Sequence, residues 1–343
     1  MRTFVFGAGA SAHAGYPLAS KLWSALEQWG RTVIAPEEYR DGAFGTMNRM
    51  FDMSLPFELA LTQLDERIAA PLDLYDKACL PIVRGEIQHR ICQYFDSVRA
   101  QRADLYDLFA QKVLAPGDVV ITFNYDVSLD RELQKSGRWT ALDGYGFALD
   151  GCSASRSQCT LLKLHGSTNW IAQLFGGLHG TTFAIDLGQP ALGYRPVIPA
   201  PELKFLESGC TDPKFVMGTG YVLPLIMPAA KKKFYMETSL NPREWEDFWD
   251  YLWSQAEHSI AMSDELHIVG YSLPEYDDRA RELLLRKARR ECKVSISCRS
   301  DSARLAEVFR QNRFADVRSP GGGSFEDWLE VESKSLAVRA RSA

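Results

Sequence analysis

The sequence predicts an α/β fold in which a parallel sheet is covered by helices on both faces, with an inserted helical subdomain. Several short apolar runs rich in β-branched residues end at a glycine or a polar residue, as buried strands do. Helical stretches separate these runs, and strand–helix–strand units of this length imply parallel pairing. Residues 36–115 show helical patterning with few strand runs, so we expect a helical insertion there within one domain over residues 1–335.

The first strand and the loop after it read TFVFGAGASAHAGYP, from Thr3 to Pro17. Gly7 and Gly9 allow a tight turn and let the backbone approach a ligand where a Cβ would collide. Apolar residues at helical spacing follow the loop. A strand, a glycine turn and a helix N-terminus in this order often bind a pyrophosphate, so the amides of Ala8–Ser11 are candidate phosphate donors. The alternative is an ordinary glycine turn in a βα unit.

Three later strands also end at residues of chemical interest. The strand predicted at Val119–Phe123 is followed by Asn124, that at Thr160–Leu164 by His165, and the run ELHIV by Gly270. In an open parallel sheet, ligands bind in the crevice beyond the carboxyl ends of the strands. The sequence therefore predicts a Rossmann-like sheet in which these residues and the first glycine turn lie along one edge.

Composition narrows the class of protein. The chain has 343 residues, a net charge of −5 and 46% hydrophobic residues, which is typical of a soluble globular protein. The negative charge argues against direct binding of nucleic acid. The chain contains neither a signal peptide nor the roughly 20 apolar residues of a membrane span, so we expect a cytoplasmic protein with no membrane contact.

The seven cysteines are scattered and form no C-x-x-C pair. Such usage is typical of reduced thiols in a cytosolic protein. Cys152 with Cys159, and Cys292 with Cys298, are spaced too widely for a zinc knuckle. We therefore expect no metal.

Four motifs, in this order along the chain, resemble those of the sirtuins. Gly7–Pro17 keeps the spacing G-A-G-x-S-x-x-x-G-x-P, and TFNYD, from Thr122 to Asp126, is similar to T-Q-N-x-D. LHGS resembles the catalytic histidine–glycine pair, and GYSL resembles the G-T-S turn. The longer segments LLKLHGSTNW, IVGYSLPEYD and PLIMPAAKKK look like the bacterial sirtuin-like proteins of anti-phage defence.

Two departures from the sirtuin pattern bear on the activity that the resemblance implies. Leu18-Ala19-Ser20 stands where sirtuin deacylases have Asp-Phe-Arg, and the four-cysteine zinc module is missing. The defence proteins share both departures. The resemblance therefore implies an NAD+ hydrolase (an NADase that releases nicotinamide and ADP-ribose) in anti-phage defence, with NAD as substrate and no metal.

The resemblance and the residue types together assign roles to the site residues. Asn124 offers both a donor and an acceptor to orient a water or the ribose hydroxyls, and His165 is suited to act as general base near neutral pH. Asp126 would fix the Asn124 loop or a ribose hydroxyl. The residues expected to bind NAD are Gly7, Ala8, Gly9, Ala10, Ser11, Gly15, Tyr16, Pro17, Thr122, Asp126, Gly270, Tyr271 and Ser272.

Each assignment has an alternative. Asn124 is also a suitable cap for a helix beginning near Val127, and Asp126 is the better cap candidate. A redox enzyme is a further hypothesis, because Gly7–Ala12 satisfies G-x-G-x-x-A and RTVIAPEE would then supply a second strand with Glu37 or Glu38 on the ribose. A non-catalytic NAD or ADP-ribose sensor and an NAD-dependent protein deacylase are the others.

The partners expected from the resemblance are further copies of the chain and a second defence protein. A free NAD hydrolase would deplete the cell, so we expect the isolated protein to be restrained. The resemblance suggests a homo-oligomer, with a HerA-type ATPase or an Argonaute-like protein as partner.

Overall fold

The computed structural model describes residues 1–98, 104–147, 157–172, 192–194, 203–205, 242–320 and 323–342. The chain divides into two compact units, each described by itself. The first unit comprises Met1–Tyr16, Arg99–Leu164 and Trp249–Ala343, and the second comprises Pro17–Val98 and His165–Phe248.

The first unit is built on a six-stranded parallel sheet in the order β3-β2-β1-β7-β8-β9. Its strands are β1 (Arg2–Phe6), β2 (Val119–Thr122), β3 (Thr160–Lys163), β7 (Glu265–Val269), β8 (Lys293–Ser297) and β9 (Asp316–Arg318). In chain order this is 3-2-1-4-5-6, the order of doubly wound dinucleotide-binding sheets. The predicted Rossmann-like α/β fold is confirmed. Each predicted strand lies within one or two residues of the observed one.

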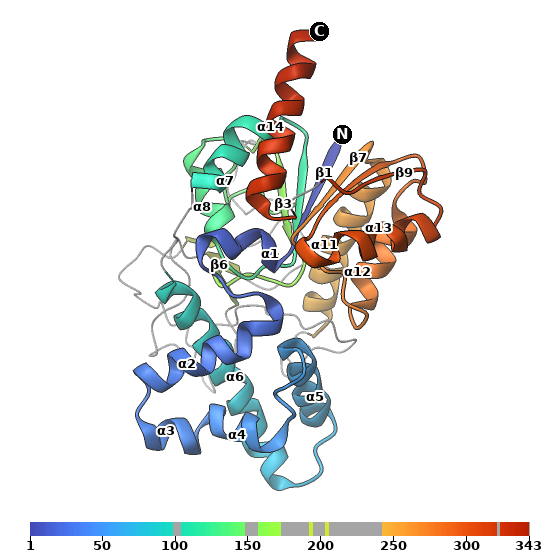
Figure 1. The fold of residues 1–343 in the computed structure, drawn as a ribbon. Helices are drawn as coiled ribbons and strands as arrows, with labels where there is room; N and C mark the ends of the chain where they lie inside the picture. Colours follow the sequence, from blue (N-terminus) through green and yellow to red (C-terminus); the bar gives the residue numbers. More distant parts are fainter. Residues whose placement is uncertain are drawn as a thin grey trace. The chain divides into compact units, whose positions relative to one another are not determined.

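Helices cover both faces of this sheet. They are α1 (Ala8–Ser11), α7 (Asp104–Leu108), α8 (Ser128–Lys135), α12 (Asp278–Glu282), α13 (Ser302–Gln311) and α14 (Phe325–Ser342), together with α11 (Pro242–Met262) from Trp249 onwards. In Figure 1, α7, α8 and α14 lie on one side of the sheet and α11, α12 and α13 on the other.

Alternation along β1 explains how both faces are filled. Phe4 and Phe6 point to one face, where each ring centroid lies 5.9 Å from that of Trp328 in α14. Thr3 points to the other face, and its hydroxyl forms a hydrogen bond with that of Ser263, directly after α11. Because both faces are packed, four of the five residues of β1 are buried.

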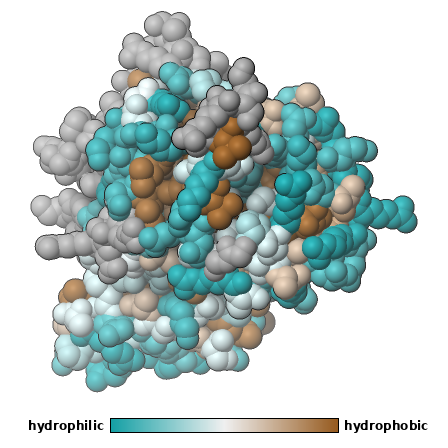
Figure 2. Space-filling view, turned by 45° about the horizontal axis from the view of Figure 1, so that its top comes forward, coloured by the Kyte–Doolittle hydropathy of each residue, from teal (hydrophilic) through white to brown (hydrophobic). Residues whose placement is uncertain are grey.

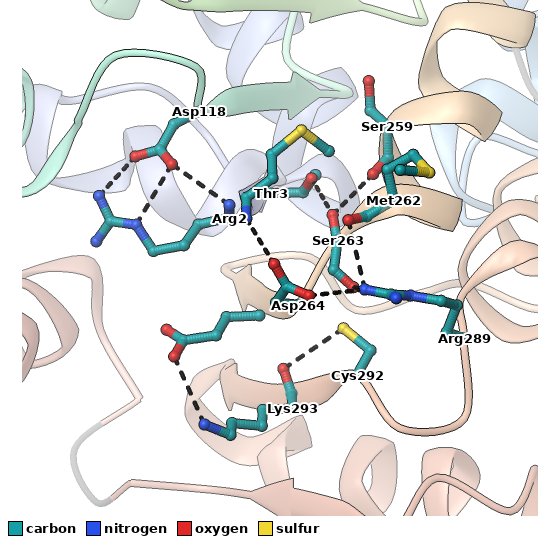
Figure 3. Close-up of polar contacts among 12 residues, drawn as sticks. Arg2, Thr3, Asp118, Ser259, Met262, Ser263, Asp264, Arg289, Cys292 and Lys293 are labelled. Atoms are coloured by element: carbon teal, nitrogen blue, oxygen red, sulfur yellow. Dashed lines mark hydrogen bonds and ion pairs between the residues drawn. The ribbon is translucent and has the colours of Figure 1, made fainter.

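Ion pairs hold the amino-terminal edge of the sheet (Figure 3). The guanidinium of Arg2 donates to the Asp118 carboxylate over 2.5 Å. The Ala115 amide donates to the same carboxylate over 2.8 Å. Asp264 accepts from the Met1 ammonium at 2.7 Å and from Arg289 at 2.8 Å. These two donors hold the pKa of the Asp264 carboxyl below its usual value. The pairs join the starts of β1, β2 and β7, at the edge opposite the glycine turn.

The described helices of the second unit are α2 (Leu22–Val33), α3 (Pro36–Asp41), α4 (Ala43–Met50), α5 (Phe57–Ala69) and α6 (Leu74–Ser97). They pack on a core that includes Trp23 stacked on Phe57, and a buried ion pair joins Arg84 to Asp65 at 2.7 Å. The unit also holds a small antiparallel sheet, β4-β6-β5, made of Trp170–Ala172, Leu203–Phe205 and Leu192–Tyr194.

The helical region differs in extent from the expected 36–115. Its helices begin at Leu22, and α7 belongs to the sheet unit. The segment RTVI, which a redox enzyme would use as a second strand, is the end of α2. Since α3 starts at Pro36, Glu37 and Glu38 lie in its first turn and do not follow a strand. The structure therefore contradicts the arrangement that the redox hypothesis requires.

The surface agrees with the composition. On the face in Figure 2, hydrophilic side chains predominate among the coloured residues, and the apolar patches are small and separated. No helix among the described residues is long and apolar enough to cross a membrane.

Candidate functional site

Three neighbouring strands place their carboxyl ends side by side. The amide of Phe123, after β2, donates to the carbonyl of Phe6 in β1 over 3.0 Å. The amide of Gly7, after β1, donates to the carbonyl of Val269 in β7 over 3.1 Å. Asn124, Gly7 and Gly270 therefore follow adjacent strands at one edge, as the sequence predicts.

The glycine turns after β1 and β7 pack backbone against backbone. The Gly9 amide donates to the Gly270 carbonyl over 2.9 Å. A Cβ on Gly7 would lie 2.6 Å from the Cα of Tyr271, and a Cβ on Gly270 would lie 2.7 Å from the Cα of Gly9. Gly270 also has φ +64°, which favours glycine. The contact between the two turns therefore requires these glycines, a reason that the sequence analysis, with its tight turn and ligand approach, did not include.

The helix after the first glycine turn is short, and some of the backbone amides expected to bind phosphate already donate hydrogen bonds within the protein. α1 has 4 residues, and Gly15 at φ +94° ends the tight helical turn after it. The Gly9 and Ala10 amides already donate to the carbonyls of Gly270 and Gly7. In this conformation, these two amides of the Ala8–Ser11 set are engaged within the protein.

The side chain of Asn124 connects β2 to the first glycine turn. Its Nδ2 donates to the Gly7 carbonyl and to the Ser11 hydroxyl, both over 3.0 Å. Its backbone amide donates to Thr122 Oγ1 over 3.1 Å. The half-buried amide is thus fixed by Gly7 in the turn after β1, by Ser11 in α1 and by Thr122 in β2.

Behind Asn124 lies a buried polar group centred on Asp126. Its carboxylate accepts from the Ser128 amide over 3.0 Å and forms a hydrogen bond with the Ser11 hydroxyl. The hydroxyls of Ser11 and Tyr106 are 2.7 Å apart. Burial raises the pKa of Asp126, while the positive charge of Lys163 opposes the shift. Asp126 therefore accepts from the first amide of α8, although the N-cap position is held by Val127, which makes no side-chain cap bond.

Lys163 is a participant that the site prediction missed. It is fully buried at the end of β3, and its ammonium donates to the carbonyl of Asp126 over 2.6 Å. It also lies 3.0 Å from Oδ2 of Asp130 in α8, whose Oδ1 accepts from the Tyr145 hydroxyl over 2.5 Å. The available signal was a lysine within the apolar strand run TLLKL, where a charge requires a buried partner.

Two predicted residues after β7 have structural contacts. The Tyr271 ring stacks on Phe123, with centroids 4.2 Å apart, and its hydroxyl donates to Asp277 over 2.7 Å. Ser272 is exposed, and its carbonyl accepts from Arg304 over 2.6 Å. Tyr271 therefore braces the end of β2, and Ser272 lies where a ligand has access.

His13 joins the glycine turn to α14. Its ring stacks on Phe325 with centroids 5.0 Å apart and meets Tyr106 edge-on at 4.6 Å. Its Nδ1 lies 2.7 Å from the carbonyl oxygen of Ala10. The start of α14 thus supports the turn from the side of the aromatic core.

The remaining predicted residues lie where the chain passes from one unit to the other. Tyr16 is the last residue of the first segment of the sheet unit and is buried. Pro17 and His165 begin the two segments of the second unit; His165 is buried and Pro17 is half-buried. The assignment of these three residues to the site rests on the sequence. Among the described residues there is no group of three or more His, Cys, Asp or Glu side chains suited to hold a metal ion.

Comparison with known proteins gives likenesses in structure alone. No family model and no curated protein matches the chain. A crystal structure of a Sir2 homologue–NAD complex is similar over 98% of this chain and 90% of that chain, with 12% identity and a TM-score of 0.44. A mutant of Sir2 homologues in complex with 2′-O-acetyl ADP ribose is similar over 98% and 92%, with 14% identity and a TM-score of 0.43. The α/β assignment rests on the strand order and register of the sheet.

Proposed function

We propose that this protein is an NAD+ hydrolase that cleaves the nicotinamide–ribose bond to give nicotinamide and ADP-ribose. The observation that carries the proposal is the side chain of Asn124, held by Gly7 and Ser11 at the carboxyl edge of the sheet. In sheets of this strand order, dinucleotides bind at that edge, at the point where the strand order reverses. Here the reversal lies between β1 and β7, and Asn124, which follows β2, donates to Gly7 at the end of β1.

Hydrolysis of the nicotinamide–ribose bond requires a positioned water and one group that accepts a proton from it. The bond between the ribose C1′ and the nicotinamide nitrogen breaks, and its electron pair stays with the nitrogen, which leaves as neutral nicotinamide. The ribose passes through an oxocarbenium-like state, as in other glycosidic cleavages. The oxygen of a water then bonds to C1′, and the water loses one proton. Asn124 orients this water or the ribose hydroxyls, and His165 accepts the proton.

The substrate-binding set follows from the same edge of the sheet. Asp126 holds the Ser11 hydroxyl and the loop of Asn124 in place. Ser272, being exposed, meets a phosphate or the adenosine ribose. The amides of Ala8 and Ser11 hold the pyrophosphate, because those of Gly9 and Ala10 donate within the protein.

The test is chromatography of NAD+ after incubation with the purified protein, alone and with candidate partner proteins. Asn124→Ala and His165→Ala should each lower nicotinamide release by about 10²–10⁴-fold with the fold intact, as expected for loss of an acid–base or positioning group. Asn312→Ala is the matched control, because Asn312 is also half-buried and donates to a carbonyl, that of Val308, over 2.8 Å. Near-wild-type turnover in either site variant would refute the mechanism.

Other outcomes of the same assay identify the alternatives. Binding of NAD+ with no nicotinamide released under any condition identifies a sensor. Release that depends on an acetyl-lysine peptide identifies a deacylase. Either result overturns the hydrolase proposal.

We also propose a role as an anti-phage effector that acts as a homo-oligomer or with a partner such as a HerA-type ATPase or an Argonaute-like protein. The sequence resemblance supports this role, and unrestrained hydrolysis would deplete the NAD of the host. Size measurement in solution, with and without neighbouring gene products, tests the assembly. NAD levels in infected cells test the role: no fall of NAD on infection would contradict it.

A further inference from the structure

We propose that Lys163 is a positioning residue of the candidate site, whose buried ammonium holds the Asn124–Asp126 segment against the first glycine turn. Its consequence for catalysis rests on the function proposed above. Its consequence for the conformation of the loop does not, and is tested separately.

The Lys163 ammonium lies between the loop that follows β2 and α8, the helix that follows this loop. It donates to the carbonyl of Asp126, in the loop after β2, over 2.6 Å, and it contacts both carboxylate oxygens of Asp130 in α8, at 3.0 and 3.3 Å. These contacts match the three donors of a lysine ammonium. Lys163 is fully buried, and these groups compensate the positive charge of its ammonium.

The position of Asp126 determines where the Asn124 amide lies. Only one residue separates the two, so a carbonyl fixed at Asp126 limits how far Asn124 can move. The same loop is also held by two bonds that backbone amides donate to side chains: the Asn124 amide donates to Thr122 Oγ1, and the Ser128 amide donates to the Asp126 carboxylate. The Lys163 contact differs because it is charged, buried and comes from a third element, β3.

Stability alone does not account for such a pair. A buried ion pair contributes little more to folding than well-packed apolar side chains of similar volume. The neighbours of Lys163 in β3 are leucines, and an apolar residue would suit the strand equally well. What an apolar residue lacks is a donor for the Asp126 carbonyl, so the specific effect of Lys163 is on the geometry of the loop.

The main test uses the double variant Lys163→Met/Asp130→Asn in the full chain. Lys163→Met alone would leave the Asp130 carboxylate buried and uncompensated, which endangers folding, and the second substitution removes that charge. The amide oxygen that replaces the carboxylate can still accept from the Tyr145 hydroxyl. Hydrogen exchange followed by mass spectrometry should show the Asn124 and Ser128 amides exchanging at least about tenfold faster than in the wild type, with β1 and β7 unchanged.

The matched control is Arg2→Met/Asp118→Asn, which removes a partly buried ion pair of the same sheet at the opposite edge (Figure 3). It should lower overall stability and leave exchange at Asn124 and Ser128 as in the wild type. The comparison separates an effect on the loop from a general loss of stability.

The catalytic measurement determines kcat and KM separately. The Lys163→Met/Asp130→Asn variant should lower kcat for nicotinamide release by about ten- to a hundredfold, because small misplacements of a reacting group have such effects. KM for NAD+ should stay within about threefold, since the binding groups remain. The control pair should keep the wild-type kcat.

The outcomes distinguish the two proposals. Wild-type exchange at Asn124 and Ser128 in the folded double variant, or equally faster exchange throughout the sheet, overturns the positioning role of Lys163. An unchanged kcat also overturns it. Absence of nicotinamide release by the wild type refutes the hydrolase, and the exchange measurement then decides the role of Lys163 by itself.

Discussion

Replacing Gly270 by alanine tests the contact between the two glycine turns, and Gly117 provides a control with the same backbone conformation. Gly270 has φ +64° and Gly117 has φ +83°. A Cβ on Gly270 would overlap the backbone of Gly9 and Ala10, whereas a Cβ on Gly117 would have no atom within 4 Å. The two substitutions therefore share the conformational strain and differ in the steric overlap.

The magnitudes follow from these two contributions. An alanine held in the left-handed backbone region destabilises the folded state by about 1–2 kcal/mol. Alanine also lowers the conformational entropy of the unfolded chain relative to glycine, which offsets about 0.4–1 kcal/mol of this loss. We expect Gly117→Ala to lose about 1 kcal/mol. The overlap adds about 1–3 kcal/mol for Gly270→Ala, since backbone atoms must move. For a unit of 150–250 residues, 1 kcal/mol lowers Tm by about 2–4 °C. The expected losses are about 2–4 °C for Gly117→Ala and about 4–16 °C for Gly270→Ala.

Thermal unfolding followed by circular dichroism and by differential scanning calorimetry measures both variants. Calorimetry is included because the chain has two compact units, whose transitions need not coincide. Equal losses in Tm for the two variants would refute the view that the turns are in backbone contact. A rise in Tm for Gly117→Ala would refute the assumption that the left-handed backbone conformation strains an alanine at both positions.

Three further predictions concern buried groups. Burial raises the pKa of Asp126, so the folded wild type loses stability as pH rises through that raised pKa; Asp126→Asn should remove this loss, as urea unfolding at pH 4–8 will measure. Phe325→Ala should lower the free energy of unfolding by about 3–5 kcal/mol, because the ring is buried. Burial raises the pKa of three cysteine thiols, to about 12 for Cys159 and to about 11 for Cys292 and Cys298. These thiols should therefore react with iodoacetamide at pH 7.5 far more slowly in the folded protein than in urea, as peptide mapping will show.

Opposite outcomes would contradict each of these. A steeper loss of stability with rising pH in Asp126→Asn would show that Lys163 dominates the carboxylate and that burial does not. A loss below about 1 kcal/mol in Phe325→Ala would place the start of α14 outside the core. Rapid labelling of the folded protein at the three thiols, which flank β3 and β8, would show that the ends of these strands open readily.

The strands of the sheet could be predicted because each is a short apolar run bounded by a glycine or a polar residue. β9, Asp316–Arg318, was not predicted, because a three-residue edge strand with two charged residues has no such signal. The end of α2 was open to a strand interpretation because Thr32, Val33 and Ile34 are β-branched. The helix is held by the buried residues Leu22, Trp23, Leu26 and Gly30, and their tertiary contacts override the local preference at its exposed end.

The positions of Asn124 and Gly270 at one edge could be predicted from parallel topology. The reason for the glycines could not, since a sequence does not reveal that the backbone of Tyr271 lies opposite Gly7. The interpretation of Ala8–Ser11 as a phosphate cradle failed to anticipate the bond from Gly9 to Gly270 for the same reason. Lys163 was missed because its partner Asp130 is a helix residue far along the chain.

The strand order has a consequence for synthesis on the ribosome. β1 is central, and its residue Thr3 pairs with Val119 on one side and with Leu266 on the other. At about 5–20 residues per second, translation reaches β7 roughly 15–50 s after β1 has been made. Until then an apolar strand with a free edge is available to other nascent chains. The segment that carries the glycine turn is thus made well before the strand that completes its pairing, so its folding yield should depend on chaperones that bind before β7 emerges.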